Sequence, residues 1–360
     1  MKVGLIYYTP DYHKLVEMTA RECYQSYHKV SPDSHGFIRG IMGKGHVSIA
    51  SVGNIVFGVA DFTGLEEFNS VCMDLLTMKE INNYIRWTLP NMKKNPDSKV
   101  GIVISMNILT FLDILNKIDE YEMASPLFEL MKKNTDKKPI LRWFYDPAVE
   151  LVPSENIYVN KPEPELYKPV VLTSDYQVLK EKGLNKYELD IHSTVTVNIK
   201  TSRDSVLQMW RHADMTGGTE LSQRYVDRTN AEIRRLIGFE KGEYPDSLEE
   251  YAKKQNLSIK EAKDVWDAWV DSFYVKLESI VESYSRYKED FISMGMRQGR
   301  AKEIARAMLP NAVTTKTIQC RPLRQWKHFF NLRDSVHAQP EIRKDAQALK
   351  EAFRAEGIEI

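Results

Sequence analysis

The stretch Ser202–Tyr225 concentrates side-chain types that bind anionic, hydrogen-bonding ligands. A short helix is expected to end at Arg211-His212, and Gly217-Gly218 and the polar run Glu220–Tyr225 follow. Arginine presents a planar fork of donors to phosphate, imidazole donates or stacks, and glycine lets backbone approach a ligand closely. On a helix, Gln208, Arg211 and His212 lie at i, i+3 and i+4 and therefore share one face. The stretch predicts a nucleotide or phosphate site, with an ordinary solvated helix surface as the alternative.

The elements that position this stretch follow from apolar patterning. β-Branched or alternating runs predict strands over Lys2–Tyr8, Val52–Phe62, Lys99–Met106 and Tyr187–Lys200. Capping residues, glycine or proline stops and three- to four-residue apolar spacing predict the helices. These helices are expected near Pro10–His28, Ser34–Met42, Leu65–Met92, Asn107–Ile118, Ser202–His212, Ser258–Met294, Arg300–Leu309, Arg321–Arg333 and Ala338–Glu356. On the longest one, the inner stripe is expected to include Trp266, Trp269, Phe273, Tyr284 and Tyr287.

This pattern indicates an α+β fold, helix-rich with a small mixed or antiparallel sheet. The chain of 360 residues is long enough for one large domain or two modest ones. We expect a single domain over 1–360, interrupted by an insertion at about 120–186 and a second at about 239–257. No internal repeat is visible in the sequence.

Composition narrows the partners. Fifty basic residues balance fifty acidic ones, which argues against a nucleic-acid partner. The cysteines Cys23, Cys72 and Cys320 are far apart, so neither a disulfide framework nor a metal site is expected. No apolar run approaches the roughly 20 residues of a membrane span, and the N-terminus lacks a signal-peptide pattern. The expectation is a cytoplasmic protein with no membrane partner and no bound metal.

The order of several short motifs resembles the flavin-dependent thymidylate synthases. The signature of that family, Arg-His-Arg followed by Glu-x-Ser-x-Arg-Tyr, is similar to Arg211-His212-Ala213 and Glu220–Tyr225. Further segments resemble the family in the right order: Ala20–Tyr24, Gly45-His46-Val47-Ser48, Ala305–Pro310, Arg324, Phe329–Arg333 and His337–Arg343. The resemblance covers roughly 200 residues, in two blocks around the first insertion.

The resemblance implies a homotetramer of α+β subunits with FAD at the subunit interfaces. It implies transfer of a one-carbon unit from 5,10-methylenetetrahydrofolate to C5 of dUMP, with NADPH as the reductant. Arg333 matches the arginine that polarises the pyrimidine, and His46 matches a histidine on the folate side. The flavin contacts implied by position are Ser48, Arg211, His212, Arg324, His328 and His337. The implied nucleotide contacts are Gln208, Glu220, Ser222, Gln223, Arg224 and Arg306.

The chain departs from the family pattern at flavin and folate contacts and beneath the base. Ala213 stands where the signature has Arg, Gly217-Gly218 replaces Ser and Asn, Ser51 replaces an acid, and Pro322 replaces an Asn. Arginine can donate to cytosine N3 as readily as it pairs with an ionised uracil N3. Two alternatives therefore stay open: a dCMP methyl- or hydroxymethyltransferase on the same scaffold, and a non-catalytic nucleotide-binding homologue.

Overall fold

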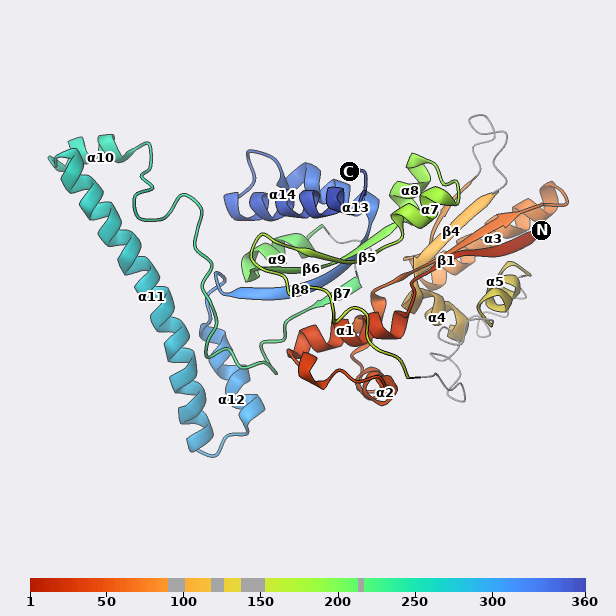
Figure 1. Cartoon of the computed structure of the whole chain (residues 1–360), viewed down its shortest axis with the longest axis horizontal. Coiled ribbons are helices and arrows are strands. Elements are labelled where there is room, and N and C mark those ends of the chain that lie inside the picture. Colours follow the sequence, from red (N-terminus) through yellow and green to blue (C-terminus); the bar gives the residue numbers. More distant parts are fainter. Residues whose placement is uncertain (90–100, 118–125, 137–152, 213–216) are drawn as a thin grey trace.

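Two antiparallel four-stranded sheets form the centre of the molecule, which the computed structural model describes over residues 1–89, 101–117, 126–136, 153–212 and 217–360 (Figure 1). The first sheet has the order β1-β2-β4-β3 and the second the order β5-β6-β8-β7. Their strands are β1 Lys2–Tyr8, β2 Asn54–Ala60, β3 Arg86–Thr88, β4 Ile102–Asn107, β5 Val170–Ser174, β6 Thr194–Ser202, β7 Gly217–Glu220 and β8 Thr314–Pro322. The predicted α+β class is confirmed, with two sheets where one was expected.

The two sheets agree in register as well as in strand order. Every residue pair that joins β5 to β6 has a counterpart joining β1 to β2, including the bulge that skips Ile6 in β1 and Leu172 in β5. The pair Asn54–Asn107 of β2 and β4 corresponds to Thr194–Pro322 of β6 and β8. The β3–β4 and β7–β8 pairs correspond in the same way. We call residues 2–117 the first unit and residues 170–333 the second unit.

The equivalence extends to the hydrogen bonds at the strand ends. In the first unit, the Asn54 amide donates to Thr9 Oγ1 at 2.8 Å. In the second unit, the Thr194 amide donates to Asp175 Oδ1 at 2.7 Å. Thr9 and Asp175 each directly follow the first strand of their unit, so an equivalent side chain accepts the bond in both units.

Helices cover both sheets. In the first unit these are α1 Tyr12–Tyr24, α2 His35–Met42, α3 Leu65–Ile81 and α4 Ile108–Lys117, followed by α5 Pro126–Asp136 and joined by the 3₁₀ turns η1 Tyr27–Lys29 and η2 Val47–Ser51. In the second unit and beyond they are α7 Tyr176–Glu181, α8 Lys186–His192, α9 Arg203–Trp210, α10 Leu248–Gln255, α11 Ile259–Ser293, α12 Gln298–Ala305, η4 Arg306–Met308, α13 Leu323–Arg333 and α14 Pro340–Ala355. Helices α13 and α14 lie over one face of the second sheet, and α1 packs on β7 and β8 (Figure 1).

The cores of the two units are shared. One apolar cluster is built mainly from the first unit but includes Ile318 and Cys320 of β8. The other gathers Trp326, Phe329 and Phe353 around the second sheet and includes Tyr7 and Val56 of the first. Because each sheet contributes to the core of the other, the two units are packed together as one body.

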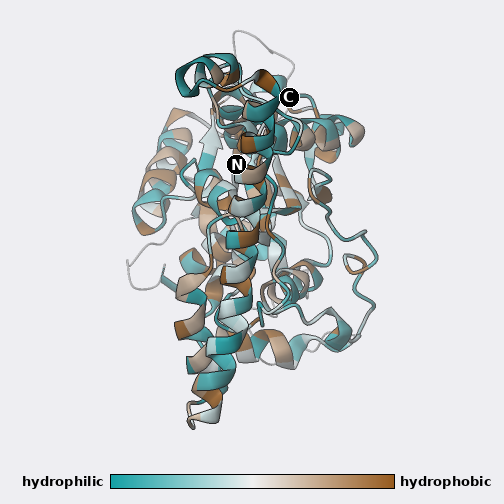
Figure 2. Ribbon diagram, turned by 90° about the vertical axis from the view of Figure 1, so that its left-hand side faces the viewer, coloured by the Kyte–Doolittle hydropathy of each residue, from teal (hydrophilic) through white to brown (hydrophobic). Residues whose placement is uncertain are grey.

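Helix α11 forms a long arm at the side of the second unit (Figure 1). The predicted capping box is confirmed, since Ser258 Oγ accepts from the Glu261 amide and Glu261 returns a bond to the Ser258 amide. The predicted inner stripe is partly wrong: Trp269 is 53% exposed and Phe273 39%. The buried positions of the arm are Ala262, Val270, Tyr274, Val281, Tyr284 and Lys288. Figure 2, in which the arm faces the viewer, shows hydrophobic and hydrophilic residues mixed along it.

The predicted strand Tyr187–Lys200 is wrong in its first half, because α8 occupies Lys186–His192 and β6 begins at Thr194. Asn185 caps this helix: its side chain accepts from the Glu188 amide, and the Glu188 carboxylate accepts from the Asn185 amide. This capping box outweighs the alternation of apolar residues, which a short helix can also produce.

Other boundaries also differ from the prediction. Helix α1 ends at Tyr24, before His28, because Gln25 adopts a left-handed conformation with φ 50°. The expected helix Leu65–Met92 stops at Ile81 and is followed by β3, while residues 90–92 lie outside the described residues. The expected start at Arg321 belongs to strand β8, and β5 and β7 were not predicted. None of the helices in the described ranges is long and apolar enough to cross a membrane.

Candidate functional site

The predicted residues His212 and Arg333 meet at the ends of two helices. Arg333 is the last residue of α13, and His212 follows α9 closely. Arg333 Nε and Nη2 lie 3.0 and 2.8 Å from His212 Nε2, although the residues are 121 apart in sequence. The His212 ring also lies 5.9 Å from the His328 ring, centroid to centroid. The structure thus brings together three of the predicted residues, and exposed Arg211 adjoins them.

The contact with Arg333 determines the protonation of His212. A guanidinium can only donate, so His212 Nε2 must be the acceptor and the imidazole must be neutral with its proton on Nδ1. Burial lowers the pKa of His212, and the charges of Arg333, His328 and Arg321 lower it further. His212 can therefore offer an Nδ1–H donor to a ligand at neutral pH.

Arg321 provides a buried positive charge beside this cluster. Its side chain is 0% exposed, and its Nη2 donates to the Met209 carbonyl at 2.9 Å. Its Nε and Nη1 have no hydrogen-bond partner within the described part of the chain. Burial lowers the pKa of Arg321 to about 9, and its guanidinium lies over the Trp326 ring at 4.6 Å. A buried cation without a carboxylate partner raises the positive potential of the site.

The predicted nucleotide contacts Arg224 and Arg306 gather around Glu303. Arg224 Nε lies 3.4 Å from Glu303 Oε1. The pKa of Glu303 is lowered by a hydrogen bond from Arg300, and the charges of Arg224 and Arg306 act in the same direction. Because Arg224 comes from the loop after β7 and Arg306 from the end of α12, two distant segments combine into one cationic group.

The remaining residues of the polar run are held from below by α1. The Ser222 amide donates to the Cys23 carbonyl at 2.9 Å. Gln223 is buried, and its Nε2 finds no partner among the described residues; the same is true of Glu220 Oε1. Burial raises the pKa of Glu220. Unpaired buried polar atoms are costly without a ligand or water, so these two atoms are available to a ligand.

The glycine pair serves packing rather than a turn. Gly217-Gly218 begins strand β7, which lies against η2 of the first unit. A Cβ on Gly217 would lie 2.0 Å from the Ser51 carbonyl oxygen. The Gly218 amide donates to Ser51 Oγ at 3.3 Å. The expectation that these glycines approach a ligand is therefore corrected: they approach Ser51. This contact places Ser48, which lies in η2, and His46, which precedes η2, next to the second unit.

Gln208 and His337 lie at the N-terminal side of α14. Gln208 Nε2 donates to Gln339 Oε1 at 2.8 Å, and Gln339 in turn donates to Asp204. The His337 amide donates to Ser335 Oγ at 3.3 Å, and its side chain is exposed. Across the described ranges, no hydrogen bond or ion pair connects these two residues, the His212–Arg333 contact and the Arg224–Glu303 pair to one another. Ala213 lies outside the described residues.

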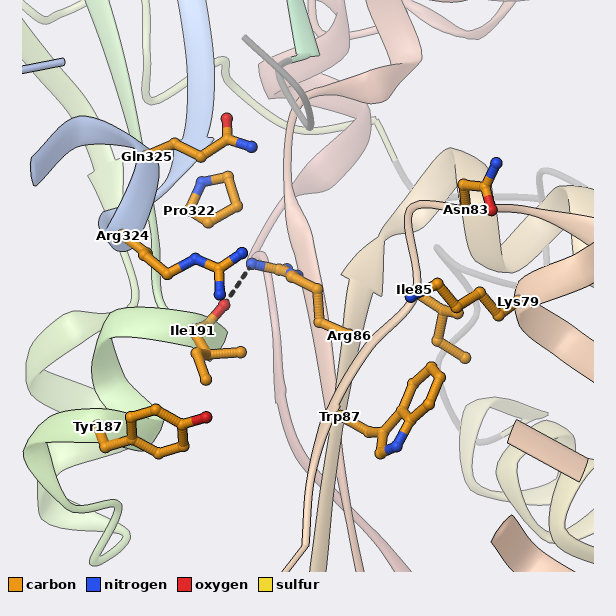
Figure 3. A pocket seen from close by; sticks show the side chains of 10 residues that line it. All are labelled: Lys79, Asn83, Ile85, Arg86, Trp87, Tyr187, Ile191, Pro322, Arg324 and Gln325. Carbon is orange, nitrogen blue, oxygen red and sulfur yellow. Dashed lines mark hydrogen bonds between the residues drawn. The ribbon is translucent and has the colours of Figure 1, made fainter. Parts of the chain in front are cut away.

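Arg324 is placed in a cleft between the two units, which we call the junction cleft (Figure 3). The first unit contributes Lys79, Arg86 and Trp87 to its lining, and the second contributes Tyr187, Ile191 and Arg324. Its volume is about 300 Å³, at the lower end of the range for small-molecule sites. None of the described side chains that line it is a carboxylate.

A buried polar network holds the floor of the junction cleft. Arg86 Nη1 donates to the Ile191 carbonyl at 2.8 Å, and its Nη2 donates to Asn54 Oδ1 at 2.7 Å. Asn54 Nδ2 donates to Asp175 Oδ2 at 2.7 Å. His192 bridges Thr88 and Ser105 through its two ring nitrogens. Burial lowers the pKa of Arg86 to about 10, and the charge of Arg324 acts in the same direction.

Sequence reasoning missed Arg321, Arg86 and Lys79. No motif marks them, and each gains its role only from the packing of the two units. The packing of β7 against η2 was also not predicted, although the two adjacent glycines indicate close backbone contact. In the described ranges, no group of three or more His, Cys, Asp or Glu side chains could hold a metal ion.

Comparison with known proteins supports the resemblance. The family model described as thymidylate synthase complementing protein matches residues 191–356. A flavin-dependent thymidylate synthase of Pyrococcus furiosus is 34% identical over 163 residues, which are 44% of this chain and 54% of that protein. Proteins of the same name from Corynebacterium efficiens and Mycolicibacterium vanbaalenii are 28% and 30% identical over 45% and 42% of this chain.

These alignments cover 58% of the Corynebacterium protein and 54% of the Mycolicibacterium protein, so the chain spans little more than half the length of the curated relatives it matches. The matched segment contains His212, Arg324 and Arg333, whereas Lys79 and Arg86 lie outside it. Residues 191–356 of this chain are thus similar to the flavin-dependent thymidylate synthases.

Proposed function

We propose that this protein uses FAD to transfer a one-carbon unit from 5,10-methylenetetrahydrofolate to C5 of dUMP, giving dTMP. The observation that carries the proposal is the contact between His212 and Arg333, because it joins an implied flavin contact to the implied pyrimidine contact. Both residues lie in the matched segment. The names of the relatives support the same general activity.

In this proposal, Arg333 acts on the pyrimidine. Its fixed positive charge stabilises negative charge that develops on the ring as C5 becomes nucleophilic. The neutral His212 imidazole accepts from Arg333 and so holds the guanidinium in one orientation. Arg321 adds positive potential from below without needing to touch the substrate.

In this proposal, Arg224 and Arg306 bind the nucleotide phosphate. Their shared neighbour Glu303 keeps both cations close together until a phosphate competes for them. Ser222, together with Gln223 Nε2 and Glu220 Oε1, which lack a partner among the described residues, supplies further hydrogen-bonding groups for the nucleotide. Gln208, now bonded to Gln339, would exchange that partner for the nucleotide.

The donor set also suits a flavin nucleotide. Exposed Arg211, Arg324, His328 and His337 offer cations and hydrogen-bond donors to its phosphates and ring. Arg321, with Nε and Nη1 buried and unpaired among the described residues, adds positive charge that acts on His212. When bound, FAD supplies the reducing equivalents for the transferred carbon, which it draws from NADPH. Ser48 and His46 would complete the flavin and folate sides from the first unit.

An assembly of four units follows from the resemblance. Because one chain already contains the sheet unit twice, we propose that two chains provide these four units, in place of the homotetramer that the resemblance alone implies. The molar mass of the purified protein in solution, measured by light scattering, distinguishes two chains from four.

Purified protein tests the function directly. We expect the yellow absorbance of a flavin, as isolated or after FAD is added. With 5,10-methylenetetrahydrofolate and NADPH, we expect the mass of dUMP to rise by one CH2, because a methyl group replaces the hydrogen at C5. Turnover of dCMP alone, or a hydroxymethyl product, would contradict the choice of substrate or product. Protein that binds dUMP but no flavin would refute the reaction and leave a nucleotide-binding protein.

Arg333→Ala tests the proposed role of Arg333. We expect loss of turnover with flavin largely retained, because the lost cation acts on the pyrimidine. Arg354→Ala, which removes an exposed arginine near the end of α14, serves as the matched control. Loss of flavin from Arg333→Ala, but not from the control, would show that Arg333 holds the cofactor instead.

A further inference from the structure

The common register of the two sheets matches residues of the first unit with residues of the second. Because Asn107 and Pro322 are equivalent strand ends, the helices that follow start at equivalent residues. The second residue of α4 is Leu109, and the second residue of α13 is Arg324. The first unit has therefore kept the backbone at this position and carries an apolar side chain where the second unit carries a cation.

The contacts between the two units are also made at positions that the strand register matches. Register makes Arg86 equivalent to Gly217 as the first residue of β3 and β7. By the match of β2 with β6, Ser51 is equivalent to Ile191. Arg86 meets the Ile191 carbonyl, and Gly217 meets the Ser51 carbonyl. The interface is thus reciprocal, like that of a two-fold symmetric dimer.

Different side chains give the two halves of this interface different shapes. At the β3 side, Arg86 reaches Ile191 through its long side chain, and the junction cleft lies beside it (Figure 3). At the β7 side, Gly217 brings the backbone so close to Ser51 that a Cβ would lie 2.0 Å from the Ser51 carbonyl oxygen. The contact between Gly217 and Ser51, which is equivalent to the one between Arg86 and Ile191, therefore leaves no room for a side chain.

The junction cleft concentrates positive charge. Lys79 and Arg324 are exposed, and Arg86 adds a half-buried guanidinium to the same lining. Trp87, whose ring lies 5.2 Å from Lys79 Nζ, and the exposed Tyr187 add aromatic surface. The charge of Arg324 disfavours the charged form of Arg86, and an anion in the cleft would relieve this repulsion. Aromatic walls favour a planar group attached to that anion.

We propose that the junction cleft is a composite site for one planar ligand bearing phosphate, such as a flavin or adenine nucleotide. Arg324 of the second unit and Lys79 of the first supply its phosphate contacts, and Trp87 supplies a wall for the ring. The first unit thus serves the second by completing this site, and each chain holds one site of this kind. The proposal rests on the proposed function only in the choice of FAD as one probe.

The test uses the full-length protein with two probes, FAD and ADP, in equilibrium titrations followed by calorimetry. The variants are Lys79→Met and Arg324→Met. Lys253→Met on α10 and Arg354→Met on α14 remove exposed cations elsewhere and serve as matched controls. We expect each cleft variant to raise the Kd by about 10-fold, as for one charge-assisted contact, while the controls leave it unchanged. Binding of one probe molecule at this site per chain is expected.

The outcomes separate this proposal from the proposed reaction. If FAD binds and neither cleft variant weakens it, the flavin lies elsewhere; the composite site is refuted and the reaction is untouched. An effect of Arg324→Met without an effect of Lys79→Met refutes the contribution of the first unit. If ADP binds with dependence on both cations while FAD does not bind, the composite site stands and the flavin reaction fails. If neither FAD nor ADP binds, the composite site and the flavin reaction are both refuted.

Discussion

Arg321→Met should make the protein more stable, although it removes a charge from the candidate site. The Arg321 guanidinium is fully buried, has no carboxylate partner, and leaves Nε and Nη1 unpaired in the part of the chain that the structure describes. Burial lowers its pKa to about 9, a drop that corresponds to roughly 5 kcal/mol of unfavourable charge burial at neutral pH.

Part of this gain is offset by contacts that methionine cannot make. The bonds to the Met209 carbonyl and the Gln319 side chain and the position over Trp326 together contribute roughly 2 kcal/mol. The net expectation is a gain of about 3 kcal/mol in the free energy of unfolding at pH 7. The pKa of Arg321 is depressed in the folded state, so its penalty is present below pH 9 and fades as pH rises through that value. The gain should therefore shrink above pH 9.

Urea denaturation at pH 7 and pH 10 measures both expectations. Arg354→Met, an exposed arginine on α14, serves as the matched control and should change stability by less than about 0.5 kcal/mol. A loss of stability in Arg321→Met, or a gain that is the same at both pH values, would refute the reasoning. NMR titration should also show a higher pKa for His212, since Arg321 contributes to its depression.

Three further changes probe the packing that supports the site. Asp345→Ala should cost about 3–5 kcal/mol in thermal unfolding, because it leaves the buried Arg234, now 2.9 Å from Asp345, without a counter-ion. Burial lowers the pKa of His13 from 6.5 to about 4, so stability should be lost as pH falls through this range; His13→Phe should remove roughly 3 kcal/mol of that acid dependence in urea titrations. Gly217→Ala should lower the melting temperature markedly, because its Cβ would lie 2.0 Å from the Ser51 carbonyl oxygen.

Each of these predictions has a control. Asp345→Asn keeps the size of the side chain and should cost less than Asp345→Ala. His35→Phe tests whether the acid dependence belongs to the stacked neighbour of His13, which lies 5.4 Å away between ring centroids. Gly299→Ala in α12 places a Cβ in open space and should be neutral or slightly stabilising. A Gly217→Ala protein as stable as the wild type would contradict the packing described for β7.

Local signals in the sequence were sufficient to predict the helices that have capping residues or a regular apolar spacing. The Ser258–Glu261 capping box predicts the start of α11, and the apolar spacing of Ile342, Ala346, Leu349 and Phe353 predicts the buried face of α14. Strand β7 could not be predicted, because Gly-Gly-Thr-Glu has little intrinsic tendency to form a strand. It forms because glycine permits the close approach to η2.

The site was predictable as residue types but not as contacts. His212 and Arg333 belong to motifs, yet nothing in the sequence says that they touch each other. The Arg224–Glu303 pair and the junction cleft likewise arise from segments far apart in the chain. The equivalence of the two units was invisible because strand register is a property of backbone pairing, and it survives when the side chains have diverged.

The reciprocal interface of the two units also bears on how this protein can change. In a dimer of identical subunits, any substitution at the interface appears twice, once on each side of the symmetry axis. Here Arg86 and Gly217 occupy equivalent positions but are encoded separately, so either can be replaced while the other is kept. One half of the interface is thereby free to acquire a new ligand preference while the other half preserves the cohesion of the fold.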